Sequence, residues 1–248
     1  MTAVASPAVD TAELRKARGA FFTPEPIARY VTEWAVRSPT EDVLEPSCGE
    51  TAFLLATVEH IARLHASAPA PATAGGLDGV ELHPESASAT EAMLRQAGVN
   101  ARVTAGDFFC VEPTGSYDVV VGNPPYIRYQ DFSGEARTRS RAAALRAGVP
   151  LTNLASSWAA FTVHSALFLK PGGRMGLVLP AELLSVNYAA EVRAFLLREF
   201  ASVDLVVFTE RVFPGAEAQY REIRCQVFAA TSCGLYTPEA TSSKGGYW

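Results

Sequence analysis

The sequence predicts an α/β fold in which a mainly parallel β-sheet carries helices on both faces. Short apolar runs rich in β-branched residues alternate along the chain with segments of helical periodicity. The run 118–121 is almost continuously apolar, which is typical of a strand covered on both faces. Strands that alternate with helices form right-handed crossovers, and these place the strands parallel and the helices on both sides of the sheet.

A helix is expected to begin at Thr23, with Thr23 as N-cap, Pro24 in the first position and Glu25 in the first turn. Apolar residues then recur at helical spacing, namely Ile27, Val31, Trp34 and Ala35. A short strand over 43–45 follows, and then a helix over about 51–66.

The remaining elements continue the alternation. Further strands are expected to end near 81 and to span 101–105, 118–121, 175–179, 203–208 and 223–230. Helices are expected over 83–97, 154–170 and 188–198, and Pro171-Gly172-Gly173 is expected to stop the second of them. The segment 67–76 (SAPAPATAGG) is typical of a surface loop.

Composition predicts one domain. Of 248 residues, 48% are hydrophobic and 19% charged, which allows a substantial core and excludes a disordered, collagen-like or coiled-coil chain. We expect a frayed leader over 1–14, a single domain over 15–232 and a loose tail over 233–248. The stretch 147–169 lacks Asp, Glu, Lys and Arg, but it contains Pro150, Asn153 and His164. A buried helix starting near Asn153 therefore suits it better than a membrane span.

Charge and cysteine usage narrow the function classes. The formal net charge of −5 argues against a nucleic-acid binder that works by bulk charge alone, and leaves room for a local basic surface. The four cysteines form no C-x-x-C pair, and the four histidines have no metal-type spacing with them. These patterns, with no secretory signal at the start, predict a reduced, cytoplasmic protein without a metal site.

Ligand-type residues follow the first three strands at the carboxyl ends, where parallel sheets bind ligands. The loop Glu45-Pro46-Ser47-Cys48-Gly49 has small residues that let backbone amides approach a ligand before a helix. Glu81 can hold two ribose hydroxyls, Asp107 can accept from an adenine amino group, and Phe108 can stack on the ring. Taken singly, the residues 47–49 could be only a turn, Glu81 a charge at the start of a helix and Phe108 a core residue. Together they predict a pocket for an adenosine-containing cofactor.

The segment after the fourth strand, Gly122-Asn123-Pro124-Pro125-Tyr126, indicates the substrate. Two prolines fix the backbone and remove two N–H donors, which leaves carbonyls free to accept hydrogen bonds. Asn123 adds a side-chain acceptor, and Tyr126 adds a flat ring. This array suits a planar substrate bearing an NH₂ group, although a rigid turn with an exposed tyrosine is the alternative. The pocket itself fits nicotinamide cofactors or S-adenosylmethionine. A nicotinamide site would need G-x-G-x-x-G after the first strand, and that motif is absent there.

Asn123-Pro124-Pro125-Tyr126 resembles the NPPY motif of the methyltransferases that act on N6 of adenine in DNA. The segment 15–24 resembles the element ahead of the first strand in the gamma-class members, in which the Thr-Pro region, here Thr23, contacts the methionine end of the cofactor. Residues 45–49, 81 and 107–108 match the next motifs in order, and 224–228 resembles the antiparallel seventh strand. The resemblance covers 15 to about 230. It implies a Rossmann-like methyltransferase domain with a mainly parallel seven-stranded sheet.

The resemblance also implies a reaction. The chain would transfer a methyl group from S-adenosyl-L-methionine to N6 of adenine in DNA, as in restriction-modification systems, on a base flipped out of the duplex. The N6 lone pair is delocalised, so hydrogen bonds to the Asn123 side-chain oxygen and the Pro124 carbonyl would hold the amine for attack. Tyr126 and Phe228 would sandwich the base, with Tyr220 as the weaker alternative to Phe228.

Two features depart from the family pattern. Relatives that recognise their own target sequence carry a further domain, whereas only 20 residues follow Phe228 here. We therefore expect DNA as substrate and a separate specificity subunit or recognition domain as partner. From Arg128 to Arg146 five arginines stand against Asp131 and Glu135, a local charge of +3. This segment is expected to be a DNA-facing loop and lid, with a solvated helical face as the alternative.

Other functions remain open at the level of sequence. A methyltransferase acting on protein glutamine, RNA adenine or a small molecule would also bind a planar NH₂ group. A non-catalytic scaffold subunit is the further alternative, and intact cofactor motifs count against it.

Overall fold

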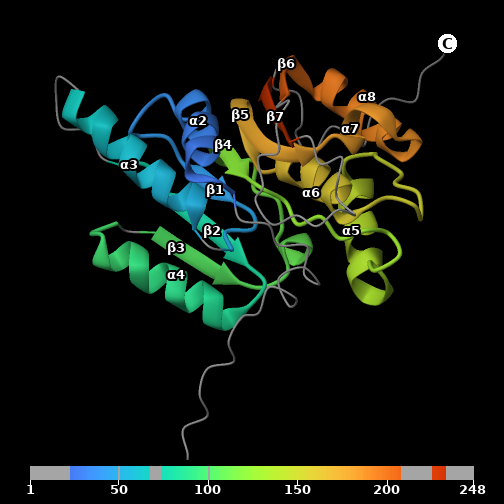
Figure 1. Ribbon diagram of the computed structural model, residues 1–248, viewed down its shortest axis with the longest axis horizontal. Helices are drawn as coiled ribbons and strands as arrows, with labels where there is room; N and C mark the ends of the chain where they lie inside the picture. Colours follow the sequence, from blue (N-terminus) through green and yellow to red (C-terminus); the bar gives the residue numbers. More distant parts are fainter. Residues whose placement is uncertain (1–22, 50, 68–73, 100, 208–224, 233–248) are drawn as a thin grey trace, which may run out of the picture.

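A single seven-stranded sheet forms the centre of the protein. The computed structural model describes residues 23–49, 51–67, 74–99, 101–207 and 225–232, with side chains described up to 206. Within these ranges the strand order is β3-β2-β1-β4-β5-β7-β6 (Figure 1). The strands are β1 (Val43–Glu45), β2 (Leu77–Glu81), β3 (Ala101–Ala105), β4 (Tyr117–Gly122), β5 (Leu169–Pro180), β6 (Phe200–Val207) and β7 (Cys225–Ser232). Strand β7 runs antiparallel to β5 and β6, and the other pairs are parallel. This confirms the predicted fold class.

Helices cover both faces of the sheet. They are α2 (Glu25–Ala35), α3 (Ala52–Ser67), α4 (Pro84–Gln96), α5 (Gly134–Arg146), α6 (Ser157–Ala166), α7 (Glu182–Ser185) and α8 (Ala190–Glu199), with 3-10 turns η1 (Phe108–Cys110) and η2 (Asn187–Ala189). Helices α2, α3 and α4 share a core on one face, and α6 and α8 lie on the other (Figure 1). Helix α5 packs on α6 and η1. The leader, the tail and most of the loop 67–76 lie outside the described residues.

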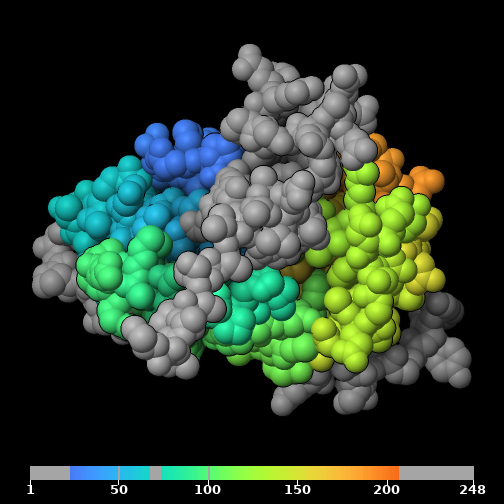
Figure 2. Space-filling view, turned by 60° about the horizontal axis from the view of Figure 1, so that its bottom comes forward, coloured from blue at the N-terminus to red at the C-terminus, as the bar shows by residue number. Residues whose placement is uncertain are grey.

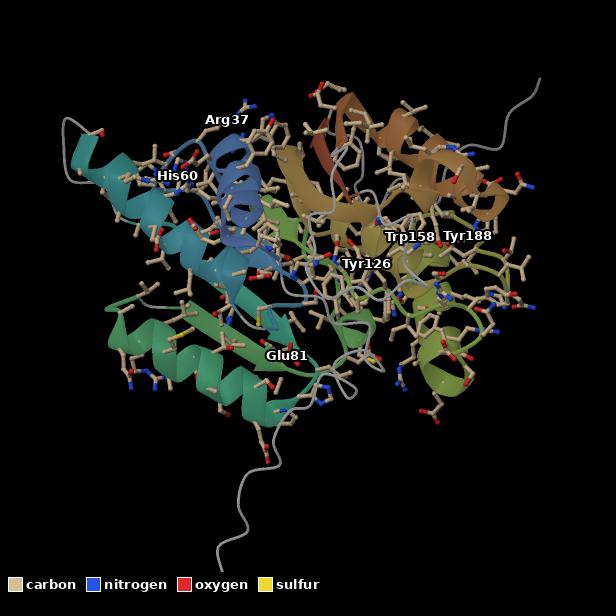
Figure 3. All side chains as sticks on the ribbon, in the orientation of Figure 1. Arg37, His60, Glu81, Tyr126, Trp158 and Tyr188 are labelled. Atoms are coloured by element: carbon tan, nitrogen blue, oxygen red, sulfur yellow. The ribbon has the colours of Figure 1, made fainter. Side chains whose placement is uncertain are left out.

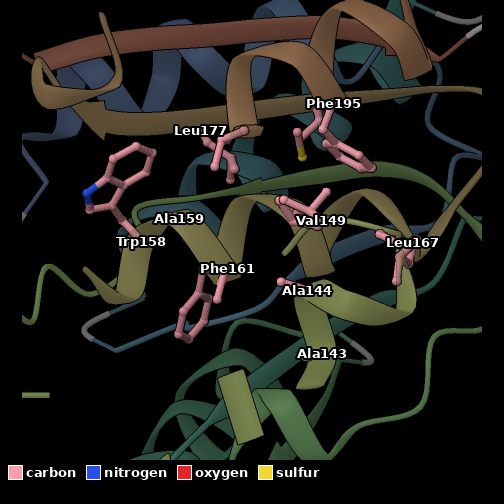
Figure 4. Close-up of a cluster of buried hydrophobic side chains, with 14 of the residues drawn as sticks. Ala143, Ala144, Val149, Trp158, Ala159, Phe161, Leu167, Leu177 and Phe195 are labelled. Atoms are coloured by element: carbon pink, nitrogen blue, oxygen red, sulfur yellow. The ribbon is translucent and has the colours of Figure 1, made fainter. Parts of the chain in front are cut away.

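The central strand β4 shows why its sequence is almost wholly apolar. Val119 and Val121 belong to the core under α2 and α3, whereas Val120 belongs to the core on the opposite face. Successive side chains of a strand point to opposite faces, so a strand buried on both sides must be apolar at every position. In the second core, Trp158 and Phe161 of α6 and Leu177 of β5 are among the labelled side chains in Figure 4.

Helix α2 lies directly against the sheet because β5 has a glycine beneath it. A Cβ atom added at Gly176 would come within 2.6 Å of Val31 Cγ1. Any larger residue would force α2 away from the sheet. This matters for the site, because the residues just ahead of α2 reach its edge.

The helix expected over 154–170 is shorter than predicted. Helix α6 ends at Ala166, and the chain from Leu169 onward already belongs to β5, where Leu169 pairs with Tyr117. The register shifts between Tyr117 and Val119, and Pro171-Gly172-Gly173 falls inside this irregularity. Lys170 holds the start of β5 through the carboxylates of Asp42 and Asp118, at 3.0 and 2.8 Å. The breaker residues therefore bend a strand instead of ending a helix.

The predicted N-cap of the first helix is also wrong. Pro24 occupies the N-cap position of α2, and no side chain caps this end. The Thr23 hydroxyl instead accepts a hydrogen bond from Asn123 Nδ2 at 3.0 Å.

Helix α6 has ten residues, nine of them buried. In the parts of the chain that the structure describes, no helix has the length and apolar content needed to cross a membrane.

Candidate active site

A cavity of about 510 Å³ lies at the carboxyl ends of β1, β2, β3 and β4. This is within the range of small-molecule and cofactor pockets. All nine residues predicted to bind a cofactor line it: Thr23, Glu45, Pro46, Ser47, Cys48, Gly49, Glu81, Asp107 and Phe108. Asn123 and Pro125 line the same cavity, so the structure joins the predicted cofactor motifs to the loop after β4.

The loop after β1 is held by buried carboxylates. Glu45 Oε2 accepts from the backbone N–H of Leu54, 3.1 Å away in the first turn of α3. Burial raises the pKa of the Glu45 carboxyl well above its usual range, and the charge of Glu81 raises it further. Burial, together with the charges of Glu45 and Glu81, raises the pKa of the Cys48 thiol as well. A neutral, buried thiol is a poor nucleophile, so Cys48 acts as a small lining residue.

Glu81 connects two loops at the edge of the sheet. Its Oε2 accepts from the backbone N–H of Gly49, and its Oε1 from that of His83, both at 3.0 Å. Gly49 has φ +38°, a backbone conformation that favours glycine. Each carboxylate oxygen has a second lone pair, so Glu81 can hold this geometry and still accept from a pair of hydroxyls. Figure 3 labels Glu81 on the α4 side of the molecule.

Asp107 is fixed through both of its oxygens. Oδ1 accepts from the backbone N–H of Phe109 at 3.0 Å and so caps η1. Oδ2 accepts from Arg139 Nε at 2.8 Å. Phe108 stacks on Phe161 and Phe168, with ring centroids 5.3 and 5.1 Å away, which anchors the turn in the core.

His164 of α6 binds the backbone of the turn η1. Its ring is fully buried, and Nε2 lies 3.2 Å from the carbonyl oxygens of Phe108 and Val111. Burial lowers the pKa of His164 to about 4. At neutral pH the imidazole is therefore uncharged, and its Nε2–H donates to these carbonyls.

The loop after β4 is tied to two neighbouring segments. Asn123 donates from Nδ2 to Thr23 Oγ1, and Ser47 Oγ donates to the Asn123 carbonyl at 3.3 Å. The first contact commits the amide nitrogen, so Oδ1 is the side-chain atom that can accept from a substrate amine. The contact between Thr23 and Asn123 joins residues 100 positions apart.

Ser157, at the start of α6, holds the other end of this loop. Its hydroxyl donates to the Pro125 carbonyl and accepts from the Ile127 N–H at 2.8 Å. Its own backbone N–H donates to the Ile127 carbonyl at 3.0 Å. Sequence reasoning missed this serine, because it lies among the small residues of an expected buried helix and no local pattern distinguishes it.

Of the two predicted stacking residues, the structure describes the side chain of Tyr126 alone, and this side chain does not line the cavity. Tyr126 is 9% exposed, packs in the core, and donates its hydroxyl to the Val178 carbonyl at 2.7 Å. It lies on the same side of the molecule as Trp158 and Tyr188 (Figure 3). Phe228 belongs to β7, where its backbone pairs with Leu177 and Leu205, and its side chain is outside the described part. Tyr220 lies outside the described residues altogether.

The basic segment 128–146 is mostly helical. From Gly134 onward it forms α5, so the expectation of a long loop is wrong. Several of its arginines bind groups of the same chain: Arg137 the Tyr129 carbonyl, Arg139 Asp107 and Glu135, Arg141 the Leu151 carbonyl and Asn153, and Arg146 Glu112. These contacts favour the alternative of a charged helical face.

Apolar side chains complete the cavity wall, and sequence reasoning missed most of them. They include Leu82, Ile127, Phe132 and Phe161. Leu82 is 60% exposed although it directly follows a buried strand, and the sequence signals its place in the cavity only by its position next to Glu81. Among the described residues no group of His, Cys, Asp and Glu side chains could hold a metal ion.

The sheet order and the cavity define the fold of the class I S-adenosylmethionine-dependent methyltransferases. The structure is similar to that of a Listeria monocytogenes protein assigned to this class, with a TM-score of 0.66 and 14% identity over 87% of this chain and 62% of that one. It is also similar to the methyltransferase subunit of a type I restriction-modification system from Streptococcus thermophilus. There the TM-score is 0.67 and the identity 20%, over 86% and 45% of the two chains.

The chain belongs to the N-6 DNA methylase family, whose model matches residues 10–220. It is 29% identical over 204 residues to the type II methyltransferase M.XamI of Xanthomonas campestris pv. amaranthicola, covering 79% of this chain and 37% of the relative. It is 26% identical to M.PaeR7I of Pseudomonas aeruginosa, over 75% of this chain and 36% of the relative. The chain thus spans little more than a third of the length of these relatives.

Proposed function

We propose that this chain transfers the methyl group of S-adenosyl-L-methionine to the exocyclic N6 amino group of adenine in DNA. The observation that carries the proposal is the single cavity that joins nine expected cofactor residues to Asn123 and Pro125. Membership of the N-6 DNA methylase family supports the choice of acceptor.

The cavity fits the cofactor in its hydrogen-bond acceptors. Glu81 would accept from the ribose hydroxyls and Asp107 from the adenine amino group, since both carboxylates keep lone pairs beyond their present contacts. Thr23 and the loop 45–49 would hold the methionine end. When bound, S-adenosylmethionine supplies an electrophilic methyl group on a sulfonium.

Asn123 and Pro124 would position the acceptor amine. The Thr23 hydroxyl holds Asn123 Nδ2, so Oδ1 can accept from one N6–H. The Pro124 carbonyl would accept from the other, which requires the loop to turn it toward the cavity, since Asn123 and Pro125 line the cavity and Pro124 does not. The nitrogen lone pair, held in this way, would attack the methyl carbon that the cofactor supplies, and the sulfur would leave with the bonding electrons. The methylated nitrogen is acidic and releases its proton to solvent, so no strong base is needed. Positioning then supplies most of the rate gain.

The target atom is out of reach inside a duplex, so the base would have to be flipped into the cavity. We propose that Tyr126 and Phe228 contribute the stacking surfaces. In the present arrangement Tyr126 anchors its loop through the bond to the Val178 carbonyl. Tyr126 does not line the cavity in this arrangement, so stacking on the base would require this loop to move on binding.

Target recognition would come from outside the matched region. The relatives M.XamI and M.PaeR7I are more than twice as long as their matching parts, and similar structures include type I subunits. We propose that a specificity subunit or a further recognition domain selects the DNA site. The engaged arginines of α5 would then supply only a small part of the phosphate contacts.

The test is transfer of a tritiated methyl group from S-adenosylmethionine to DNA, RNA and protein in parallel. We expect label in DNA, recovered as N6-methyladenine, and its loss in Asn123→Ala. Asn153→Ala is the matched control, because that amide binds Arg141 outside the cavity. Label in RNA adenine or protein glutamine would support the alternative acceptors, and label in no polymer would contradict the proposal.

A further inference from the structure

We propose that Arg139 is a positioning residue for cofactor selection. It holds the Asp107 carboxylate in the orientation that distinguishes an amino-purine from an oxo-purine, and it makes α5 part of the cofactor site. This inference rests on the proposed function, in which Asp107 accepts from the adenine amino group.

The Asp107 carboxylate is clamped between two elements. The backbone of η1 binds Oδ1 through the Phe109 N–H, and Arg139 of α5 binds Oδ2 through Nε. Two partners on different oxygens fix the plane of the carboxylate. The guanidinium is fixed in turn, because its Nη1 donates to Glu135 Oε2 at 2.9 Å.

Arg139 is distinguished from the other arginines of its helix by its place. It lines the cavity together with Ala136, whereas Arg137 and Arg141 bind carbonyls of Tyr129 and Leu151. In Figure 2 the yellow-green surface of 128–150 lies on one side of the molecule, opposite the blue and green surfaces of α2, α3 and α4. Arg139 and Asp107 connect these two sides at the cavity. Arg141, two positions along the same helix, is therefore a matched control.

The chemistry of the carboxylate gives this clamp a consequence. An ionised carboxylate only accepts hydrogen bonds, so it attracts the NH₂ group of adenine and repels the carbonyl oxygen that hypoxanthine has in its place. The repulsion discriminates only if the carboxylate cannot turn away. A loosely held Asp107 would tolerate both purines. Since Oδ2 has two lone pairs, Arg139 and an adenine amino group can bind it together.

The experiment is calorimetric titration of S-adenosylhomocysteine and its inosine analogue, S-inosylhomocysteine, into the full chain and its variants. We expect the wild type to prefer the adenosine compound. Arg139→Met should weaken adenosine binding about tenfold and reduce the preference by a similar factor, since a charge-assisted contact fixes the carboxylate. Arg141→Met should leave both affinities unchanged. Arg139→Gln serves as the second variant if the methionine variant does not fold.

Three results would overturn the inference. An equal loss for both compounds in Arg139→Met would mean that the ion pair only supports α5. A gain in affinity would mean that Arg139 obstructs the cavity. No change in either affinity would show that η1 alone orients Asp107. If the wild type bound no adenosine compound, the proposed function itself would be wrong. This outcome is distinguishable from the other three because it is measured on the wild type alone.

Discussion

The hydroxyl of Ser157 holds the backbone on both sides of Tyr126, and its removal should slow methyl transfer without weakening cofactor binding. The hydroxyl contacts the Pro125 carbonyl and the Ile127 N–H. Ser157→Ala deletes both hydrogen bonds, each worth about 0.5–1.5 kcal/mol, so the loop loses about 1–3 kcal/mol of restraint. If that restraint holds the acceptor amine at the transition state, the rate falls about 5-fold to 150-fold.

Single-turnover methyl transfer at saturating cofactor and DNA measures this rate, and calorimetry measures the cofactor Kd. We expect the rate to fall within that range and Kd to stay within about twofold, because Ser157 binds the Pro125–Ile127 backbone and not the cofactor motifs. Ser156→Ala is the matched control, because that hydroxyl contacts Tyr188 instead. An unchanged rate in folded Ser157→Ala would refute the reasoning. So would a loss of cofactor affinity as large as the loss of rate.

Four further predictions follow from the same geometry. The pKa of His164 in the folded protein is about 4, below its usual 6.5, so the unfolded chain binds the proton at a higher pH than the folded protein does. The free energy of unfolding should therefore fall by up to about 3 kcal/mol between pH 6.5 and pH 4. Denaturant titrations of the wild type and of His164→Asn at both pH values check this. Asn123→Ala should lower turnover at least about 100-fold with nearly unchanged cofactor affinity, measured by single-turnover kinetics and calorimetry. Glu81→Ala should weaken cofactor binding by about 1.5–3 kcal/mol, and unchanged affinity in the folded variant would remove its ribose role. Duplex DNA binding by this chain alone should be weak with a shallow salt slope in gel shifts, since arginines of α5 already bind groups of the same chain; tight, site-specific binding would place recognition in this segment.

Element order and strand positions were predictable because strands and helices bury different periodic patterns. The run 118–121 is almost wholly apolar because Val119, Val120 and Val121 enter two cores, and 101–105 is β3 without correction. The C-terminal limit of α6 was not predictable. The residues 167–170 suit a helix locally, but 167–168 form a turn, and pairing of Leu169 with Tyr117, 52 positions earlier, starts a strand there. Tertiary pairing overrode local propensity there.

The candidate site also contains residues that the sequence could indicate and residues that it could not. Residues 45–49, Glu81 and Asp107 could be found because a parallel sheet brings the carboxyl ends of its strands to one edge. Arg139 and Ser157 could not, because they lie on helices whose placement over that edge depends on packing. Thr23 was predicted to contact the methionine end of the cofactor. Its hydrogen bond with Asn123 is a further contact that the helix-start pattern does not indicate.

These contacts join the two halves of the proposed reaction. Ser47, in the expected cofactor loop, donates to the Asn123 carbonyl, and Thr23 holds the Asn123 side chain. Any shift of the loop 45–49 when a cofactor binds is therefore transmitted to the residue that would hold the acceptor amine. Ser157 fixes the other end of the loop after β4 to α6, which restrains a displacement there. A proposed acceptor site that is braced on one side by the expected cofactor loop and on the other by a helix suits a reaction in which positioning supplies most of the rate.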